Sequence, residues 1–257
     1  MLTAAGEYHV SAANLTLSFI PPEGAKPGGS YYLSRLGSVV TATGVSGVSF
    51  ENLEIRHSRG AGVQLVNSTN VVLKKCTVSD HGMMGLNISG GERCGIVESE
   101  IAGNGDAGVV LDGGDRISLT PSKHFARGCT VHHNQRWIMN YAPDVFMGGV
   151  GNSVEDSDIC KHSSFSSDPT KRPPNKGVLL SDGSPQIAVF MQGNDHTMSG
   201  CHVHDAGRQC SDCGAYYMGR EWTYRGNVRA AAQLSFRFLQ SLTEAVHSPS
   251  SNRHFLT

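Results

Sequence analysis

The sequence repeats itself along Leu53-Glu54-Ile55, Cys76-Thr77-Val78 and Ser99-Glu100-Ile101, where similar triplets follow one another every 23 residues. The triplet returns at steps of 30, 28 and 44 residues as Cys129-Thr130-Val131, Ser157-Asp158-Ile159 and Cys201-His202-Val203. In each triplet a small or apolar residue precedes a polar one and then a β-branched one. Because side chains of a strand point alternately to its two faces, the pattern predicts a short strand with one buried face.

Two further segments repeat with the triplets. Apolar segments such as Val71-Val72-Leu73 precede them, and segments such as Gly85-Leu86-Asn87-Ile88 follow them, with glycines 23 residues apart. Each repeat thus offers three short strands separated by turns, and stacked coils of this kind pair their backbones and share one core. The sequence therefore predicts an all-β fold, a right-handed parallel β-helix (a solenoid). A leucine-rich repeat lacks support because its Leu-and-Asn consensus is absent, and a β-sandwich has no reason to keep a 23-residue register.

Polar residues also recur three positions after the triplet in five of the six repeats, as Ser58, His81, Asn104, Asn134 and His162. They predict a stack of polar turn side chains about 4.8 Å apart. Cys76, Cys129 and Cys201 share one coil position two coils apart, roughly 9–10 Å, which is too far for a disulfide. We therefore expect buried thiols there. For Cys210 and Cys213 a local disulfide or two plain thiols fits better than a zinc site.

The repeat sets the expected domain boundaries. Residues 1–229 are predicted to form the β-helix domain, which we expect to be incomplete, and residues 230–257 a tail without repeats. After Val228 the coil rhythm breaks, and the tail is expected to form a short helix from about Ala230 to Ala245 or to be disordered. The long last step holds a polar, proline-rich loop at 163–174, which either covers a groove or is an inert excursion.

Composition limits the function classes. With 21 Lys and Arg against 22 Asp and Glu, the chain has no basic field for nucleic acid. No window has the length and apolar character of a membrane span, and no signal peptide is visible at the start. Three N-glycosylation sequons are compatible with secretion, but the compartment stays open. We expect a monomer.

Two polar stretches depart from the repeat rhythm and contain both tryptophans. One runs from Leu111 to Arg116 and continues at Arg136 and Trp137; the other runs from Gly193 to His196 and on to 212–227. The second combines carboxylates, histidines, arginines and large aromatics. Glycoside hydrolysis uses a pair of carboxylic acids, and aromatic rings stack on sugar faces. These stretches therefore predict a carbohydrate site.

The run Gly193-Asn194-Asp195-His196 and the block from Asp212 to Asn227 resemble a large family of right-handed parallel β-helix proteins with the pectate-lyase-like fold. That family is tied to carbohydrate-active enzymes and includes glycoside hydrolases with fucosidase and xylanase members. The resemblance covers about residues 8–229. Glu221 stands where the family usually has Asp, and Cys213 where it has Ala.

We therefore expect hydrolysis of glycosidic bonds in a poly- or oligosaccharide, with no cofactor and no metal. The candidate catalytic carboxylates are Asp195, Asp212 and Glu221. The candidate substrate-binding residues are Arg220, Trp222, Tyr217, Tyr224, Arg225, His196, Asp115 and Arg136. Asp195 and Asp212 could equally be turn residues, and the arginines could pair with these acids. The alternatives are a uronate polysaccharide lyase or epimerase and a non-catalytic glycan-binding or scaffold β-helix.

Overall fold

The computed structural model describes residues 2–21, 24–25, 28–29, 31–138, 141–160, 187–204, 206, 214–219, 221–230 and 233–235. In this part of the chain there are strands and no α-helix. None of these residues belongs to a helix that could cross a lipid bilayer. The polar loop at 163–174, His162, the Cys210–Cys213 pair and most of the C-terminal tail lie outside the described residues.

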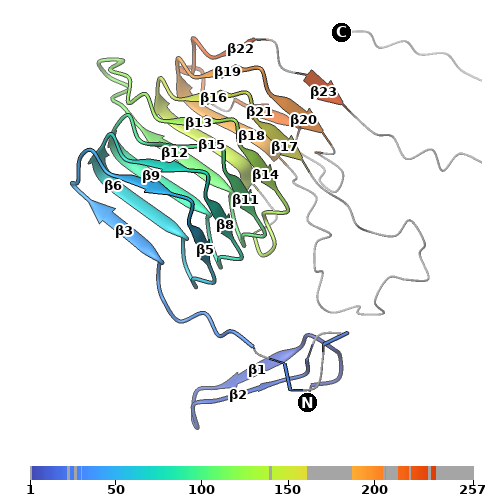
Figure 1. The fold of residues 1–257 in the computed structure, drawn as a ribbon. Helices are drawn as coiled ribbons and strands as arrows, with labels where there is room; N and C mark the ends of the chain where they lie inside the picture. Colours follow the sequence, from blue (N-terminus) through green and yellow to red (C-terminus); the bar gives the residue numbers. More distant parts are fainter. Residues whose placement is uncertain are drawn as a thin grey trace, which may run out of the picture.

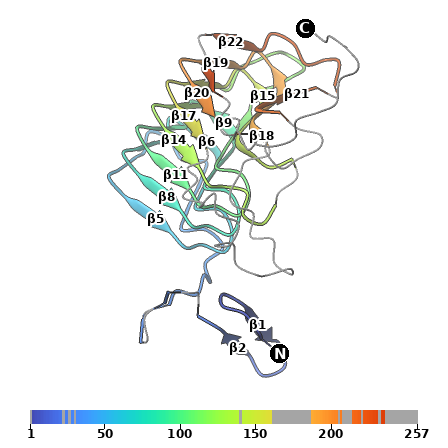
Figure 2. The same cartoon turned by 90° about the vertical axis from the view of Figure 1, so that its right-hand side faces the viewer.

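Three parallel sheets wind around one core, and each takes one strand from every coil (Figures 1 and 2). The long sheet consists of β3 (Val40–Thr43), β6 (Val63–Thr69), β9 (Leu86–Glu92), β12 (Val109–Gly113), β15 (Pro143–Val150), β18 (Ile187–Asn194) and β21 (Tyr216–Met218). The second sheet consists of β4 (Ser49–Glu51), β7 (Val72–Lys74), β10 (Gly95–Val97), β13 (Phe125–Arg127), β16 (Ser153–Glu155), β19 (Thr197–Ser199) and β22 (Val228–Ala230). The third consists of β5 (Glu54–Arg56), β8 (Thr77–Ser79), β11 (Glu100–Ala102), β14 (Thr130–His132), β17 (Asp158–Cys160), β20 (His202–His204) and β23 (Gln233–Ser235).

The coils begin later and continue further than the sequence rhythm suggests. Residues before β3 include an antiparallel hairpin, β1 (Tyr8–Ser11) with β2 (Thr16–Phe19), which pairs with no coil strand. At the other end, β22 pairs with β19, and β23 pairs with β20 through Val203 and Leu234. Residues 233–235 are therefore a strand, where the sequence suggested the start of a helix. A segment with one small-polar-apolar pattern, like that of the triplets, can add such a strand to the last strand of the third sheet.

The predicted triplets form the third sheet in the predicted register. Ile55, Val78, Ile101, Val131, Ile159 and Val203 stand opposite one another and are all buried. The residues two positions earlier form an inward column of buried side chains in the five later coils: Cys76, Ser99, Cys129, Ser157 and Cys201. Cys76, Cys129 and Cys201 are free thiols, and burial raises the pKa of Cys129 to about 11. The prediction of buried core thiols is confirmed for these positions.

Serines in this column close the turns between sheets. The Ser99 hydroxyl accepts a hydrogen bond from the Cys76 backbone N–H at 3.0 Å, and Ser157 does the same for Cys129 at 3.1 Å. The polar turn positions form a second buried ladder: Ser58 N–H donates to His81, His81 N–H to Asn104, and Asn104 N–H to Asn134. Because buried N–H groups need partners, these side chains allow each turn to lie inside the stack.

Substituting Ser99→Ala is expected to lower the free energy of unfolding by about 1–3 kcal/mol, because the buried Cys76 N–H loses its acceptor. Urea unfolding monitored by circular dichroism measures this. Ser89→Ala, on the exposed face of β9 in the neighbouring coil segment, is the control and should change stability by less than about 0.5 kcal/mol. Equal effects of the two substitutions would contradict the role given to Ser99.

Candidate functional site

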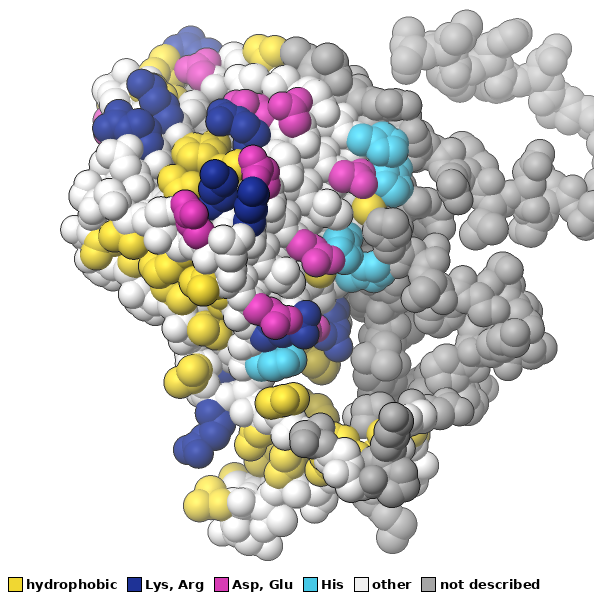
Figure 3. Space-filling model, viewed as in Figure 1, with side chains coloured by type: hydrophobic (Ala, Val, Ile, Leu, Met, Phe, Trp, Pro, Cys, Tyr) yellow, Lys and Arg dark blue, Asp and Glu magenta, His cyan; other side chains and the backbone are white. Residues whose placement is uncertain are grey.

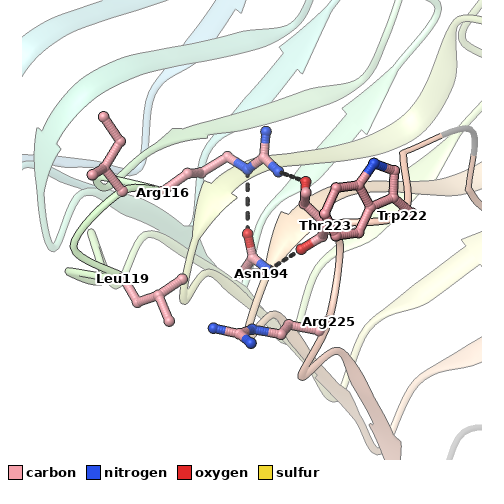
Figure 4. Close-up of a pocket in the computed structure, with 7 residues that line it drawn as sticks. Arg116, Leu119, Asn194, Trp222, Thr223 and Arg225 are labelled. Carbon is pink, nitrogen blue, oxygen red and sulfur yellow. Dashed lines mark hydrogen bonds between the residues drawn. The ribbon is translucent and has the colours of Figure 1, made fainter.

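A cavity lies where the long strands end and the chain turns toward the second sheet. The loop after β12, the end of β18 and the turn after β21 meet there. The cavity has a volume of about 290 Å³ and is lined by Arg116, Ile117, Leu119, Asn194, Trp222, Thr223 and Arg225. Figure 4 shows the guanidinium groups of Arg116 and Arg225 on either side of Asn194.

Glycines make the approach of these strands possible. Gly113, Gly149 and Gly193 stand in one row across β12, β15 and β18. A Cβ atom on Gly149 would overlap the carbonyl of Gly113, and one on Gly193 would overlap the carbonyl of Gly149. Gly149 and Gly193 also adopt φ values of 79° and 127°, which residues with a Cβ rarely adopt. The glycine row therefore allows the end of β18, which carries Asn194, to pack closely against β15, and β15 against β12.

Arg116 is held in place by several contacts. Its Nε donates to Asn194 Oδ1 at 3.2 Å, and its Nη2 donates to Thr223 Oγ1 at 2.6 Å (Figure 4). Its Cζ lies 4.7 Å from the ring centroid of Tyr224, in a cation–π arrangement. Asn194 also donates from Nδ2 to the carbonyl of Thr223 at 2.8 Å. These bonds connect three segments that are distant in sequence and orient the guanidinium toward the cavity.

The cavity has an excess of positive charge. Its lining contains two arginines and no carboxylate. Within the described part of the chain, neither guanidinium forms an ion pair with Asp or Glu, whereas Arg56, Arg93, Arg127 and Arg136 each lie beside one. Trp222, at 93% exposure, offers an aromatic face at the rim. The arrangement suits an anionic ligand that also has an apolar face.

Two of the three predicted carboxylates, Asp195 and Glu221, lie beside this lining. Asp195 follows Asn194 in the left-handed conformation (φ 56°), and its N–H donates to the carbonyl of Arg225 at 3.0 Å. Its Oδ1 occupies the space that a side chain on Gly226 would need, as Asp156 does against Gly200 in a turn between the second and third sheets. Asp195 therefore makes a turn contact that also occurs elsewhere in the β-helix.

Glu221 is linked to the cavity by hydrogen bonds. Its Oε1 accepts hydrogen bonds from Thr223, from the backbone N–H at 3.3 Å and from Oγ1 at 3.0 Å. Because Thr223 Oγ1 also contacts Arg116, one hydroxyl separates the Glu221 carboxylate from the guanidinium. Asp212 and Arg220, also predicted at this site, lie outside the described residues.

Residues 38–228 match a family model described as "right handed beta helix region". The chain belongs to this right-handed β-helix family. Among solved structures, this β-helix is similar to pectate lyase Pel9A at 15% sequence identity and a TM-score of 0.38. The match covers 77% of this chain and 50% of that one, so the chain spans half the length of the solved structure. No curated protein matches it.

His196 and Asn227, from the two runs that carry the family resemblance, hold successive turns of the β-helix together. The N–H of Asn152 donates to His196 Nδ1 at 3.1 Å, and the N–H of His196 donates to Asn227 Oδ1 at 2.9 Å. His124 continues the same ladder one coil earlier, where its N–H donates to Asn152 Oδ1. His196, a predicted substrate-binding residue, is fully buried and does not line the cavity. Burial lowers the pKa of His196 and lowers that of His124 to about 4.

The remaining predicted residues divide between the cavity and other places. Tyr224 lies under Arg116, whereas Tyr217 belongs to the outer face of the long sheet, with its ring centroid 5.2 Å from that of Phe190. Asp115 accepts hydrogen bonds from Ile117 N–H and Ser118 Oγ, which hold the pKa of its carboxyl below the ordinary value. It thereby shapes the loop that carries Arg116.

Arg136 lies elsewhere in the β-helix. It donates to the carbonyl of Gly103 at 3.3 Å and lies 3.7 Å from Asp80. These contacts are in the turns between the third and the long sheet, at the opposite end of the long strands. Sequence reasoning assigned no site role to Asn194, Thr223 or Arg116. The available signal was their position in the two stretches that break the repeat.

The ladder histidines predict how stability depends on pH. His124 stays neutral when buried, while the unfolded chain takes up its proton near pH 6.5, so acid favours unfolding. The His124 contribution is fully present above about pH 6.5 and is lost as the pH falls toward 4, by roughly 3 kcal/mol.

Urea unfolding of the wild type and of His124→Asn at pH 7 and pH 5 measures this effect. Asparagine fits the ladder, as Asn152 does in the next coil, so the variant should lose less stability between the two pH values. His9→Asn, at an exposed position in β1, should behave like the wild type. An identical pH dependence in all three proteins would refute the assignment.

Proposed function

We propose that this β-helix binds an acidic poly- or oligosaccharide in the cavity between Arg116 and Arg225 and hydrolyses its glycosidic bonds. The supporting observation is the pair of guanidinium groups that share one cavity and have no carboxylate partner among the described residues. Guanidinium groups bind carboxylates through paired, charge-assisted hydrogen bonds, and uronic acid units carry such a carboxylate. The exposed Trp222 offers a face for a pyranose ring.

The carboxylates beside the cavity supply the proposed chemistry. One carboxylic acid protonates the leaving-group oxygen, while a carboxylate activates water or attacks the anomeric carbon. Glu221 is connected to Arg116 through Thr223, and Asp195 adjoins Asn194. Asp212 remains part of this proposal on the sequence alone. The substrate carboxylate bound by the arginines would hold the neighbouring glycosidic bond beside these acids.

Eliminative cleavage is the second candidate, because the cavity contains arginines and no carboxylate. A lyase removes a proton beside the uronate carboxylate and leaves an unsaturated sugar that absorbs ultraviolet light. Hydrolysis yields new reducing ends without this absorbance. Incubation of the protein with uronate-containing and neutral polysaccharides, with and without calcium, therefore distinguishes the two reactions. Binding without either product identifies a glycan-binding protein.

The proposed arginine site can be tested by the affinity for a ligand. Arg225→Gln should weaken binding of an acidic oligosaccharide about tenfold or more, since a charge-assisted hydrogen bond contributes about 1.5–3 kcal/mol. Isothermal titration calorimetry measures the dissociation constant. Arg35→Gln, which removes the same charge from an exposed position ahead of β3, should leave it unchanged. If both variants bind like the wild type, the arginine cavity is not the binding site.

The proposed roles of the carboxylates can be tested by the reaction rate. Glu221→Gln and Asp195→Asn should each lower the rate of reducing-end release by about 100-fold or more, with affinity changed less than about threefold. Asp156→Asn is the control for Asp195, because Asp156 has the same left-handed conformation and the same contact with a glycine of the next coil, but lies in a turn between the second and third sheets. An equal loss in Asp156→Asn would show that Asp195 acts only on the turn. Full activity in Glu221→Gln would remove that residue from the mechanism.

A further inference from the structure

A second group of chemically active side chains lies on the outer face of the third sheet. Asp158 of β17 stands opposite His202 of β20, and His204 follows two residues later. Because Ile159 and Val203 point into the core, these three side chains point outward from the sheet. Figure 3 shows histidines next to acidic side chains along this flank of the molecule. This flank is separate from the cavity lined by Arg116 and Arg225, which lies in the turns between the long and second sheets.

The three side chains converge on one point. Asp158 Oδ1 lies 3.4 Å from His202 Nδ1 and 3.2 Å from His204 Nε2. One potential ligand atom from each residue lies within 4.8 Å of the other two. The two imidazole rings are stacked, with centroids 4.5 Å apart, so both rings extend in the same direction from β20.

One oxygen of the Asp158 carboxylate stands out in this arrangement. Asp158 Oδ1 is inaccessible to solvent and forms no hydrogen bond of suitable geometry with the described residues, although two imidazole nitrogens lie close to it. By contrast, Glu100 and His132, two coils away on the same face, form a hydrogen bond at 3.0 Å. A buried carboxylate oxygen without a hydrogen bond lowers the stability of the folded state unless a positively charged group binds it.

We propose that Asp158, His202 and His204 bind a zinc ion. Zinc takes imidazole nitrogen at about 2.0–2.1 Å and carboxylate oxygen at about 2.0–2.2 Å in a tetrahedron. Two ligands at such distances are about 3.4 Å apart, which matches the separations from Asp158 Oδ1 to the two nitrogens. Two imidazoles favour zinc over calcium or magnesium, which prefer oxygen ligands. A fourth position is left for water.

The position of the site indicates what the ion does. Asp158 and the two histidines belong to adjacent coils, and the chain between them makes the longest step of the repeat, 44 residues. The metal joins the two coils on either side of this insertion. A ligand that binds only the folded state stabilises it in proportion to its concentration. The inference is independent of the sugar chemistry and differs from the expectation that no metal is bound.

The test uses the full chain after treatment with a chelator, titrated with Zn²⁺ in a calorimeter. One ion should bind per chain, and Asp158→Asn and His204→Gln should each weaken binding about tenfold or more. His132→Gln is the matched control, because His132 occupies the same outward column as His204 two coils away. It should bind zinc like the wild type. The site is refuted if the wild type binds no zinc, or if the control loses as much affinity as the two variants.

Two measurements on the wild type keep the test independent of whether the variants fold. Substitution with Co²⁺ should give the visible spectrum of a tetrahedral nitrogen and oxygen site without a thiolate charge-transfer band. Such a band would assign the metal to cysteines and overturn the proposal. Zn²⁺ should also protect His202 and His204, but not His132, from acylation by diethylpyrocarbonate, as mapped by mass spectrometry. Equal modification with and without zinc would likewise overturn it.

Discussion

The hydrogen bonds between successive coils are the interaction on which the molecule depends. Each strand offers its backbone to the coil above and the coil below, so a strand of only three residues is stable because its neighbours hold it. The turns follow the same requirement. Their N–H groups are buried, and Ser, Asn and His side chains of the next coil accept their hydrogen bonds. One misplaced coil would leave both sets of donors without partners.

This requirement explains why the candidate site lies where the repeat is interrupted. Inside the stack, polar side chains are occupied by neighbouring turns, as His196 and Asn227 are. The residues that line the cavity come mainly from excursions of the chain from the coil. The loop after β12 supplies Arg116, and the turn after β21 supplies Trp222 and Arg225. The solenoid therefore supports the candidate site, and its irregular turns supply most of the residues that line it.

Asp144 shows a limit of reasoning from sequence. It is fully buried on β15 and accepts a hydrogen bond from Asn134 Nδ2 at 2.8 Å, at the end of the asparagine ladder. Burial raises the pKa of its carboxyl to about 8, so the group is largely protonated at neutral pH. Nothing in the local sequence distinguishes Asp144 from an exposed turn aspartate. Its environment is created by coils that are distant along the chain.

The sequence by itself determined the sheet register, the inward column from Cys76 to Cys201 and the polar turn ladder through Asn104. These features recur at a fixed period, and a periodic chain has one way to bury all its apolar positions at once. It also indicated the stretches in which a ligand site would lie. Only the tertiary structure decided which of their residues meet, because Arg116, Asn194 and Thr223 come from segments of different coils. Their contacts depend on the path of each loop, for which a repeat holds no information.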